Sequence, residues 1–341
     1  MLAHKEWDNP CIWIASDAEI LAQNCRRSQQ RQYRSSGVQR NTRAFSIVTS
    51  APLSPPPQTH YENFPVASFL CPPKLRAPIA ALYWFARTAD DIADEGDAAP
   101  AQRLADLAQY REDLAAAVAG GDGSARWPQV FGPLRVALQS FHLPTALLAD
   151  LLSAFEQDVA FSRDATRYAS REELLDYCRR SANPVGRLLL HLYGVQDAQS
   201  LRMSDCICSA LQLINFWQDL SVDIPRGRYY LPQDDCAAHS VAWSDLLARN
   251  QTPALTQLIA AEVGWARALM HEGAALVHRV PGRAGWELRL VVQGGLRILD
   301  KIAALNFTTM TQRPTLRAAD APLMLWRAAV MRPNPMGQSP S

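Results

Sequence analysis

Apolar residues recur every three or four positions along most of the chain after residue 60, as on one face of an α-helix. None of these stretches alternates between apolar and polar residues in the way of a half-buried strand. The pattern predicts helices over residues 74–95, 100–119, 127–141, 144–161, 171–193, 199–222, 252–280 and 284–311. We therefore expect a single all-α domain with a central cavity.

The two ends of the chain differ from this helical part. Residues 23–43 are polar, with six arginines and no acid, and APLSPPP follows shortly after. We expect residues 1–57 to be a disordered arm, or an extension that results from a start codon assigned too far upstream. Residues 58–315 form the predicted helical domain, and residues 316–341 a C-terminal helix with a polar tail.

Composition narrows the class of protein. The 341 residues are 48% hydrophobic, which is enough for a sizeable core, and the net charge of +1 gives no argument for nucleic-acid binding. The seven cysteines include no CxxC pair, which favours buried thiols in a reducing cytoplasm. No apolar run reaches the roughly 18 to 20 residues of a transmembrane helix, so any membrane contact is expected to be peripheral.

Two of the apolar runs end in aspartates that are four residues apart. LYWFARTADDIADE carries Asp90 and Asp94, and LQLINFWQDLSVDIPRGRYYL carries Asp219 and Asp223. Residues four apart share a helix face, so each pair points one way and repels itself unless a cation lies between. Either pair alone could be a solvated acidic helix end. Facing each other across a cavity, the two pairs would hold Mg²⁺ ions and, through them, a diphosphate.

ARTADDIADE and NFWQDLSVDIPRGRYYLP resemble the two aspartate-rich motifs of the squalene and phytoene synthases, which are head-to-head prenyl synthases of the all-α isoprenoid synthase fold. HYENFPVASFLCPPKLRAPIAALYWFARTADDIADEGD is similar to the bacterial hopanoid-pathway branch, whose members are called squalene or hydroxysqualene synthases. The resemblance extends from about residue 58 to about residue 315 and implies the same fold.

The resemblance also implies a metal site and a diphosphate site. The implied Mg²⁺ ligands are Asp90, Asp94, Asn215, Asp219 and Asp223. Arg87 matches a family position that contacts diphosphate, and Arg228 and Tyr230 match the R-x-Y that follows the second motif, where a phosphate contact is expected. From the residues alone, Arg87 is equally suited to an ion pair with Asp91, four residues on.

The carbocation left after diphosphate departs needs an apolar, mostly dry pocket. The resemblance implies Phe64 and Tyr83 as walls of that pocket, and position on the second helix suggests Leu211 and Phe216. Gln212 is an amide in an apolar helical run, one turn before Asn215, and therefore needs a polar partner. We place Gln212 with the substrate-binding residues.

The segment YCRRSANPVG departs from the family. Squalene and phytoene synthases usually have an aromatic residue and then Val-Ala-Gly where this chain has Arg180, Ser181, Ala182 and Asn183. One interpretation makes the arginines surface residues beside a kink at Pro184. The other makes Arg180, Ser181 or Asn183 a diphosphate contact or a group that orders water, and on it we count Arg180 and Asn183 as candidate catalytic residues.

These features imply a Mg²⁺-dependent enzyme that converts presqualene diphosphate and water to hydroxysqualene and diphosphate. No nucleotide-binding loop is recognisable, so we expect no nicotinamide. Two alternatives stay open: a squalene or phytoene synthase that condenses two prenyl diphosphates, and a noncatalytic assembly factor of the same fold. The resemblance also implies a cytoplasmic location, with any membrane contact at the inner membrane, and handover of the product to other enzymes of the pathway.

Overall fold

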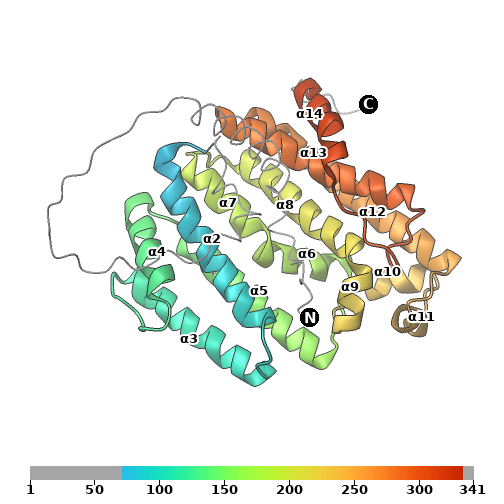
Figure 1. Cartoon of the computed structure of the whole chain (residues 1–341), viewed down its shortest axis with the longest axis horizontal. Helices are drawn as coiled ribbons and strands as arrows, with labels where there is room; N and C mark the ends of the chain where they lie inside the picture. The colour runs from blue at the N-terminus through green and yellow to red at the C-terminus, as the bar shows by residue number, and fades with distance from the viewer. Residues whose placement is uncertain (1–70, 333–341) are drawn as a thin grey trace, which may run out of the picture.

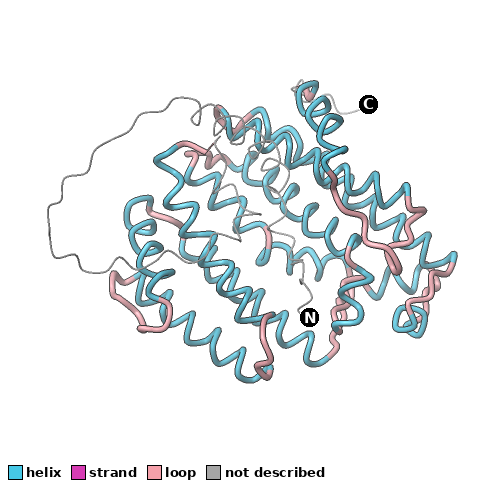
Figure 2. Tube along the Cα trace, in the orientation of Figure 1, coloured by secondary structure: helices cyan, strands magenta, loops and turns pink. Residues whose placement is uncertain are grey.

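The computed structural model describes residues 71–332. This part of the chain consists of helices and connecting loops, with one isolated bridge between Arg167 and Tyr229 (Figure 2). The predicted all-α fold is confirmed. Phe64 and the predicted arm lie outside the described residues, as do residues 333–341.

The helices pack as one bundle, in which α7 and α8 lie between the N-terminal helices and the C-terminal ones (Figure 1). The first half contains α2 (Pro73–Asp94), α3 (Pro100–Val118), α4 (Pro128–Phe141), α5 (Thr145–Asp164), α6 (Arg171–Ser181), α7 (Asn183–Leu192) and α8 (Ala198–Gln218). The second half contains α9 (Leu220–Asp223), η3 (Ile224–Arg226), α10 (Gln233–Ala238), α11 (Trp243–Ala248), α12 (Pro253–Gly273), η4 (Ala274–His278), α13 (Arg283–Ala304), η5 (Ala318–Asp320) and α14 (Ala321–Val330).

Two buried clusters hold these helices together. The first joins α2 to α5 and α7, and at its centre Phe85 stacks on Tyr110 with ring centroids 5.4 Å apart. The Tyr110 hydroxyl donates to the carbonyl of Phe85, so this buried phenol has a partner. The second cluster surrounds α8, whose Trp217 is fully buried. Since α8 contributes to the second cluster and α2 to the first, each acidic motif ends a helix anchored in the core.

The predicted helix over residues 171–193 is divided in the structure. The first part, α6, ends at Ser181, and α7 begins at Asn183 with Pro184 in its first turn. Proline has no N–H to donate and clashes with the preceding turn, but it fits the first turn of a new helix. The prediction of one continuous helix was therefore wrong at this point, while the kink interpretation placed the break correctly.

Other boundaries differ by a few residues, mainly at C-terminal ends. The second acidic motif is split at Asp219, which ends α8 and begins α9. The long run after Thr252 is helical to Gly273 and then narrows to the 3₁₀ turn η4. Across residues 71–332 no helix combines the length with the apolar character that crossing a bilayer requires.

Candidate active site

The two acidic motifs meet through an ion pair. Nη2 of Arg228, just after η3, lies 2.5 Å from Oδ1 of Asp94 at the end of α2. Residues 134 positions apart in the sequence thereby come into direct contact. The motif at the end of α2 and the motif that joins α8 to α9 therefore face one site, as predicted.

Three of the four predicted aspartates are buried. Asp90, Asp219 and Asp223 are 5%, 1% and 7% exposed, whereas Asp94 lies at the open side of the site. A buried carboxylate needs charge or hydrogen-bond compensation. For Asp219 it comes from Arg313, whose Nε lies 2.5 Å from Oδ1, and from Asn215, whose Nδ2 donates to Oδ2 at 3.3 Å. Asn215, one helical turn before Asp219, thus helps to hold the Asp219 carboxylate in place.

Arg87 occupies the centre of the first motif. Its Nη2 lies 2.7 Å from Asp91 and 2.6 Å from Glu95, and its Nη1 lies 3.3 Å from Asp90. The ion pair with Asp91 that the sequence suggested is confirmed. The single positive charge of Arg87 offsets part of the repulsion among these three acidic side chains at the end of α2.

The oxygen atoms of the two acidic motifs suit a Mg²⁺ ion that is bound by the protein and a phosphate together. Within residues 71–332, no three His, Cys, Asp or Glu side chains are grouped closely enough to hold an ion by themselves. Mg²⁺ is usually bound through one or two carboxylates together with water and substrate phosphates, so paired carboxylates facing each other are sufficient. The hard oxygens of Asp90, Asp94, Asp219 and Asp223, with the Asn215 amide, fit such an ion.

Asp158 on α5 is a site residue that the sequence did not indicate. Tyr177 donates a hydrogen bond of 2.7 Å to its Oδ2. Burial raises the pKa of Asp158 to about 7, although the positive charge of Arg228 opposes this shift and the charge of Asp94 adds to it. In the sequence, Asp158 is one acid on an ordinary amphipathic helix, so only the packing of α5 against both motifs reveals it.

Arg313 was missed for a similar reason. It lies 94 residues beyond Asp219, after the last long helix, in a stretch without regular periodicity. The only signal in the sequence is a basic residue near a proline, and that signal is common in loops.

Aromatic rings form a wall beside the site. Tyr230 stacks on Phe216 with centroids 3.7 Å apart and planes 11° apart, and both are buried. Tyr177 lies 6.1 Å from Phe216 and 6.4 Å from Tyr230. Phe216 thus belongs to a buried aromatic cluster that includes the tyrosine of the R-x-Y motif. Tyr83 is also buried, on α2, and a direct phosphate contact of Tyr230 stays a prediction.

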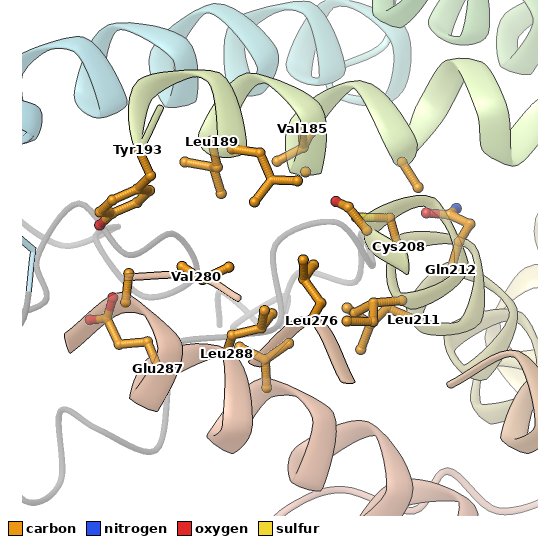
Figure 3. Close-up of a pocket in the computed structure, with 17 residues that line it drawn as sticks. Val185, Leu189, Tyr193, Cys208, Leu211, Gln212, Leu276, Val280, Glu287 and Leu288 are labelled. Atoms are coloured by element: carbon orange, nitrogen blue, oxygen red, sulfur yellow. The ribbon is translucent and has the colours of Figure 1, made fainter. Parts of the chain in front are cut away.

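An apolar cavity runs between α7, α8, η4 and α13 (Figure 3). Leu211 and Gln212 lie at one end of it, and Tyr193 and Glu287 at the other. The Gln212 side chain is 3% exposed, and on α8 it precedes Asn215 by one turn. The end of the cavity that Gln212 lines is therefore the end nearer to Asn215 along α8, although the motif aspartates are not among the residues that line the cavity. Its far end is less apolar, and burial raises the pKa of Glu287 there to about 7.

The segment that departs from the family borders this cavity through Ala182. Arg180 points toward α5, where it donates to Gln157 and to Ser153, and its Nε also donates to Asp176 at 3.2 Å. Asn183 accepts a 3.0 Å hydrogen bond at Oδ1 from Ser209 of α8. Both side chains have protein partners, and their catalytic roles stay predictions.

Comparison with known proteins agrees with this geometry. Residues 58–320 match the sequence profile of the squalene/phytoene synthase family. A hydroxysqualene synthase from Sinorhizobium fredii is 37% identical over 245 residues, 72% of this chain and 79% of that protein. A hydroxysqualene synthase from Rhodopseudomonas palustris is 35% identical over 247 residues, 72% of this chain and 80% of that protein.

The crystal structure of a squalene synthase from Alicyclobacillus acidocaldarius superposes with a TM-score of 0.66 at 36% identity, over 73% of this chain and 90% of that one. The family match over residues 58–320 covers α2 to α13 and both acidic motifs. The chain therefore belongs to the squalene/phytoene synthase family.

Proposed function

We propose that this protein is a Mg²⁺-dependent enzyme that converts presqualene diphosphate and water to hydroxysqualene and diphosphate. The observation that carries the proposal is the contact between Arg228 and Asp94, because it joins the two acidic motifs. The apolar cavity supports it, since Gln212 in the cavity wall lies one turn before Asn215 on α8. The names of the Sinorhizobium and Rhodopseudomonas relatives support hydroxysqualene as the product.

The acidic end of the site would bind the diphosphate. Mg²⁺ bound there supplies Lewis-acid stabilisation of the leaving group. Asp90, Asp94, Asn215, Asp219 and Asp223 would hold the metal. Arg87 and Arg228 would balance the charge that grows on the diphosphate oxygens as the C–O bond breaks. Because that charge is larger in the transition state than in the ground state, fixed cations accelerate the reaction rather than only tightening binding.

The apolar end would hold the hydrocarbon chains. Side chains such as Leu211, Leu276 and Leu288 are apolar, so they exclude water from most of the substrate. They also carry no nucleophile that could react with the cation. The cation formed on ionisation adds a water molecule, forms a C–O bond and releases one proton, which gives the alcohol. Gln212 is the polar side chain at the boundary between the two ends, and Arg180 and Asn183 stay candidates for positioning water from the α6–α7 junction.

Product analysis tests the proposal. The full-length protein is incubated with presqualene diphosphate and Mg²⁺ in ¹⁸O-labelled water, with and without a reduced nicotinamide. We expect hydroxysqualene that carries ¹⁸O, in equal amounts under both conditions. Squalene formed only with the nicotinamide would assign the protein to the squalene synthases.

A second arm of the experiment supplies farnesyl or geranylgeranyl diphosphate in place of presqualene diphosphate. Condensation of either substrate would support a two-substrate squalene or phytoene synthase. Absence of diphosphate release from every substrate would favour a noncatalytic assembly factor.

The proposed product is a long hydrocarbon with one hydroxyl group, and it is almost insoluble in water. We propose that it passes to a bilayer or directly to the next enzyme of the pathway, so the protein would work in the cytoplasm with peripheral contact to the inner membrane.

A further inference from the structure

The outer face of α14 is apolar. Met324 and Ala328 point inward and are buried, whereas Leu325, Trp326 and Val330 are 43%, 62% and 51% exposed. A helix face that carries large apolar side chains to the surface marks an interaction site more often than chance exposure does. This helix lies beyond residue 320, where the match to the family ends.

Trp286 on α13 extends this face. Its side chain is 49% exposed, and the guanidinium of Arg289 lies 4.8 Å from the ring centroid. The same arginine donates to the carbonyl oxygens of Ala328 and Met331 at 3.1 Å and 3.2 Å. Arg289 therefore connects Trp286 to the C-terminal end of α14. We call Trp286, Leu325, Trp326 and Val330 the α13–α14 face; α14 packs against α13, as Figure 1 shows.

Positive charge surrounds the α13–α14 face. Residues 279–289 and 321–332 contain five arginines and one glutamate. Arg279 is paired with Asp197 and Arg327 with Asp300. Arg283 and Arg332 are exposed at the edge of the face. Tryptophan next to arginine is the combination that settles at the headgroup level of a bilayer, where anionic lipids attract the cations.

The α13–α14 face also adjoins the apolar cavity. Glu287, the neighbour of Trp286, lines the end of the cavity opposite Gln212, and Leu288 lies further inward (Figure 3). Val291 also lines the cavity. We propose that the α13–α14 face docks on an anionic lipid bilayer and brings this end of the cavity against the membrane surface. The biological reason for such docking rests on the proposed function, since an insoluble triterpenoid product could then leave without crossing water.

A second copy of the chain fits the face less well. In a twofold dimer the same patch meets itself, so Arg283 and Arg332 of one copy would approach those of the other. Like charges brought together across an interface oppose association. Four large apolar side chains also make a small interface compared with the roughly 800 Å² that each partner of a stable dimer usually buries.

Vesicle flotation tests the proposal on the full-length protein without substrate, so its outcome is independent of the enzyme's reaction. The vesicles contain phosphatidylcholine alone or mixed with phosphatidylglycerol. We expect binding to the mixed vesicles, weakened by salt because the arginine contribution is screened. The double variant Trp286→Ser, Trp326→Ser should bind roughly tenfold more weakly.

The matched control is Val136→Ser with Leu247→Ser, which removes two comparably exposed apolar side chains from α4 and α11. It should bind as the wild type does. Failure of the wild type to float with anionic vesicles, or equal binding by the tryptophan variant, would overturn the proposal. Sedimentation velocity adds a further test: a wild-type dimer that the tryptophan variant abolishes would also overturn it, and would assign the face to a second copy.

Discussion

Arg228 and Asp94 form a 2.5 Å ion pair between the segment after η3 and the end of α2. This contact connects the two motifs directly through their side chains. It also places a guanidinium beside the buried carboxyl of Asp158. The arginine holds the motifs together, and we propose that it also contacts the diphosphate once substrate binds.

Replacement of Arg228 tests these functions. Arg228→Gln should lower kcat/KM by roughly 10- to 100-fold, the loss expected for one charge-assisted contact to phosphate. Arg228→Lys should recover part of the activity, since it restores the charge but not the planar fork. Steady-state kinetics give both values, with Arg163→Gln as the control, because Arg163 pairs at the surface with its neighbour Asp164. Wild-type kinetics in Arg228→Gln would show that this arginine does not contact the substrate.

The close approach of α12 to α8 gives a stability prediction. A Cβ added to Gly273 would lie 2.5 Å from the carbonyl oxygen of Met203 and 3.0 Å from the backbone nitrogen of Ile207. Backbone atoms cannot move aside without separating the helices, so Gly273→Ala should destabilise the protein by roughly 1 to 3 kcal/mol. Denaturant titration measures the change.

Gly264 provides the control within the same helix. An added Cβ would meet no atom within 4 Å there. Gly264→Ala should therefore be neutral or stabilise the protein by up to about 1 kcal/mol, because alanine loses less backbone entropy on helix formation. Equal effects of the two substitutions would contradict the packing described for α8 and α12.

Glu262 gives a prediction about pH. Its side chain is fully buried, and burial raises its pKa to about 7, although Arg171, at 3.1 Å, opposes the shift. An acid whose pKa is raised on folding keeps its proton longer in the folded protein than in the unfolded chain. Its contribution to the free energy of unfolding therefore falls as pH rises from about 4.5 to about 7, by at most roughly 3 kcal/mol.

Glu262→Gln removes this titration and keeps an acceptor for Arg171. The free energy of unfolding of the variant, relative to wild type, should be higher at pH 8 than at pH 4.5. Urea titrations at the two pH values measure the difference, and Glu112→Gln, at an exposed position, serves as the control. If the variant and the wild type differed in free energy of unfolding by the same amount at both pH values, folding would not raise the pKa of Glu262.

Local patterns in the sequence predicted most of the fold and suggested the aspartates of the candidate site. The helical repeat located α2 and α8 because each buries one continuous apolar face, and the four-residue spacing identified Asp90 with Asp94 and Asp219 with Asp223. Such signals are local, since each depends on residues within one or two turns.

What the sequence did not predict depends on packing between distant helices. Asp158 becomes part of the site only because α5 lies against both motifs, and Arg313 because the chain returns to Asp219 after α13. The break at Asn183 follows from a single proline in an otherwise regular pattern. The apolar residues of α14 follow an ordinary helical repeat, so the sequence alone does not reveal which of them face solvent. The structure shows that Trp326 is exposed.

Release of diphosphate from presqualene diphosphate, measured against Mg²⁺ concentration, tests the central claim most directly. The wild type should be inactive in EDTA and regain turnover on addition of Mg²⁺. Asp90→Asn and Asp219→Asn should each abolish turnover while circular dichroism shows unchanged helical content, because the amide fits the same space but removes the negative charge that attracts Mg²⁺. Asp122→Asn, at an exposed position, should behave as the wild type. Turnover that persists in EDTA, or in either site variant, would contradict the account.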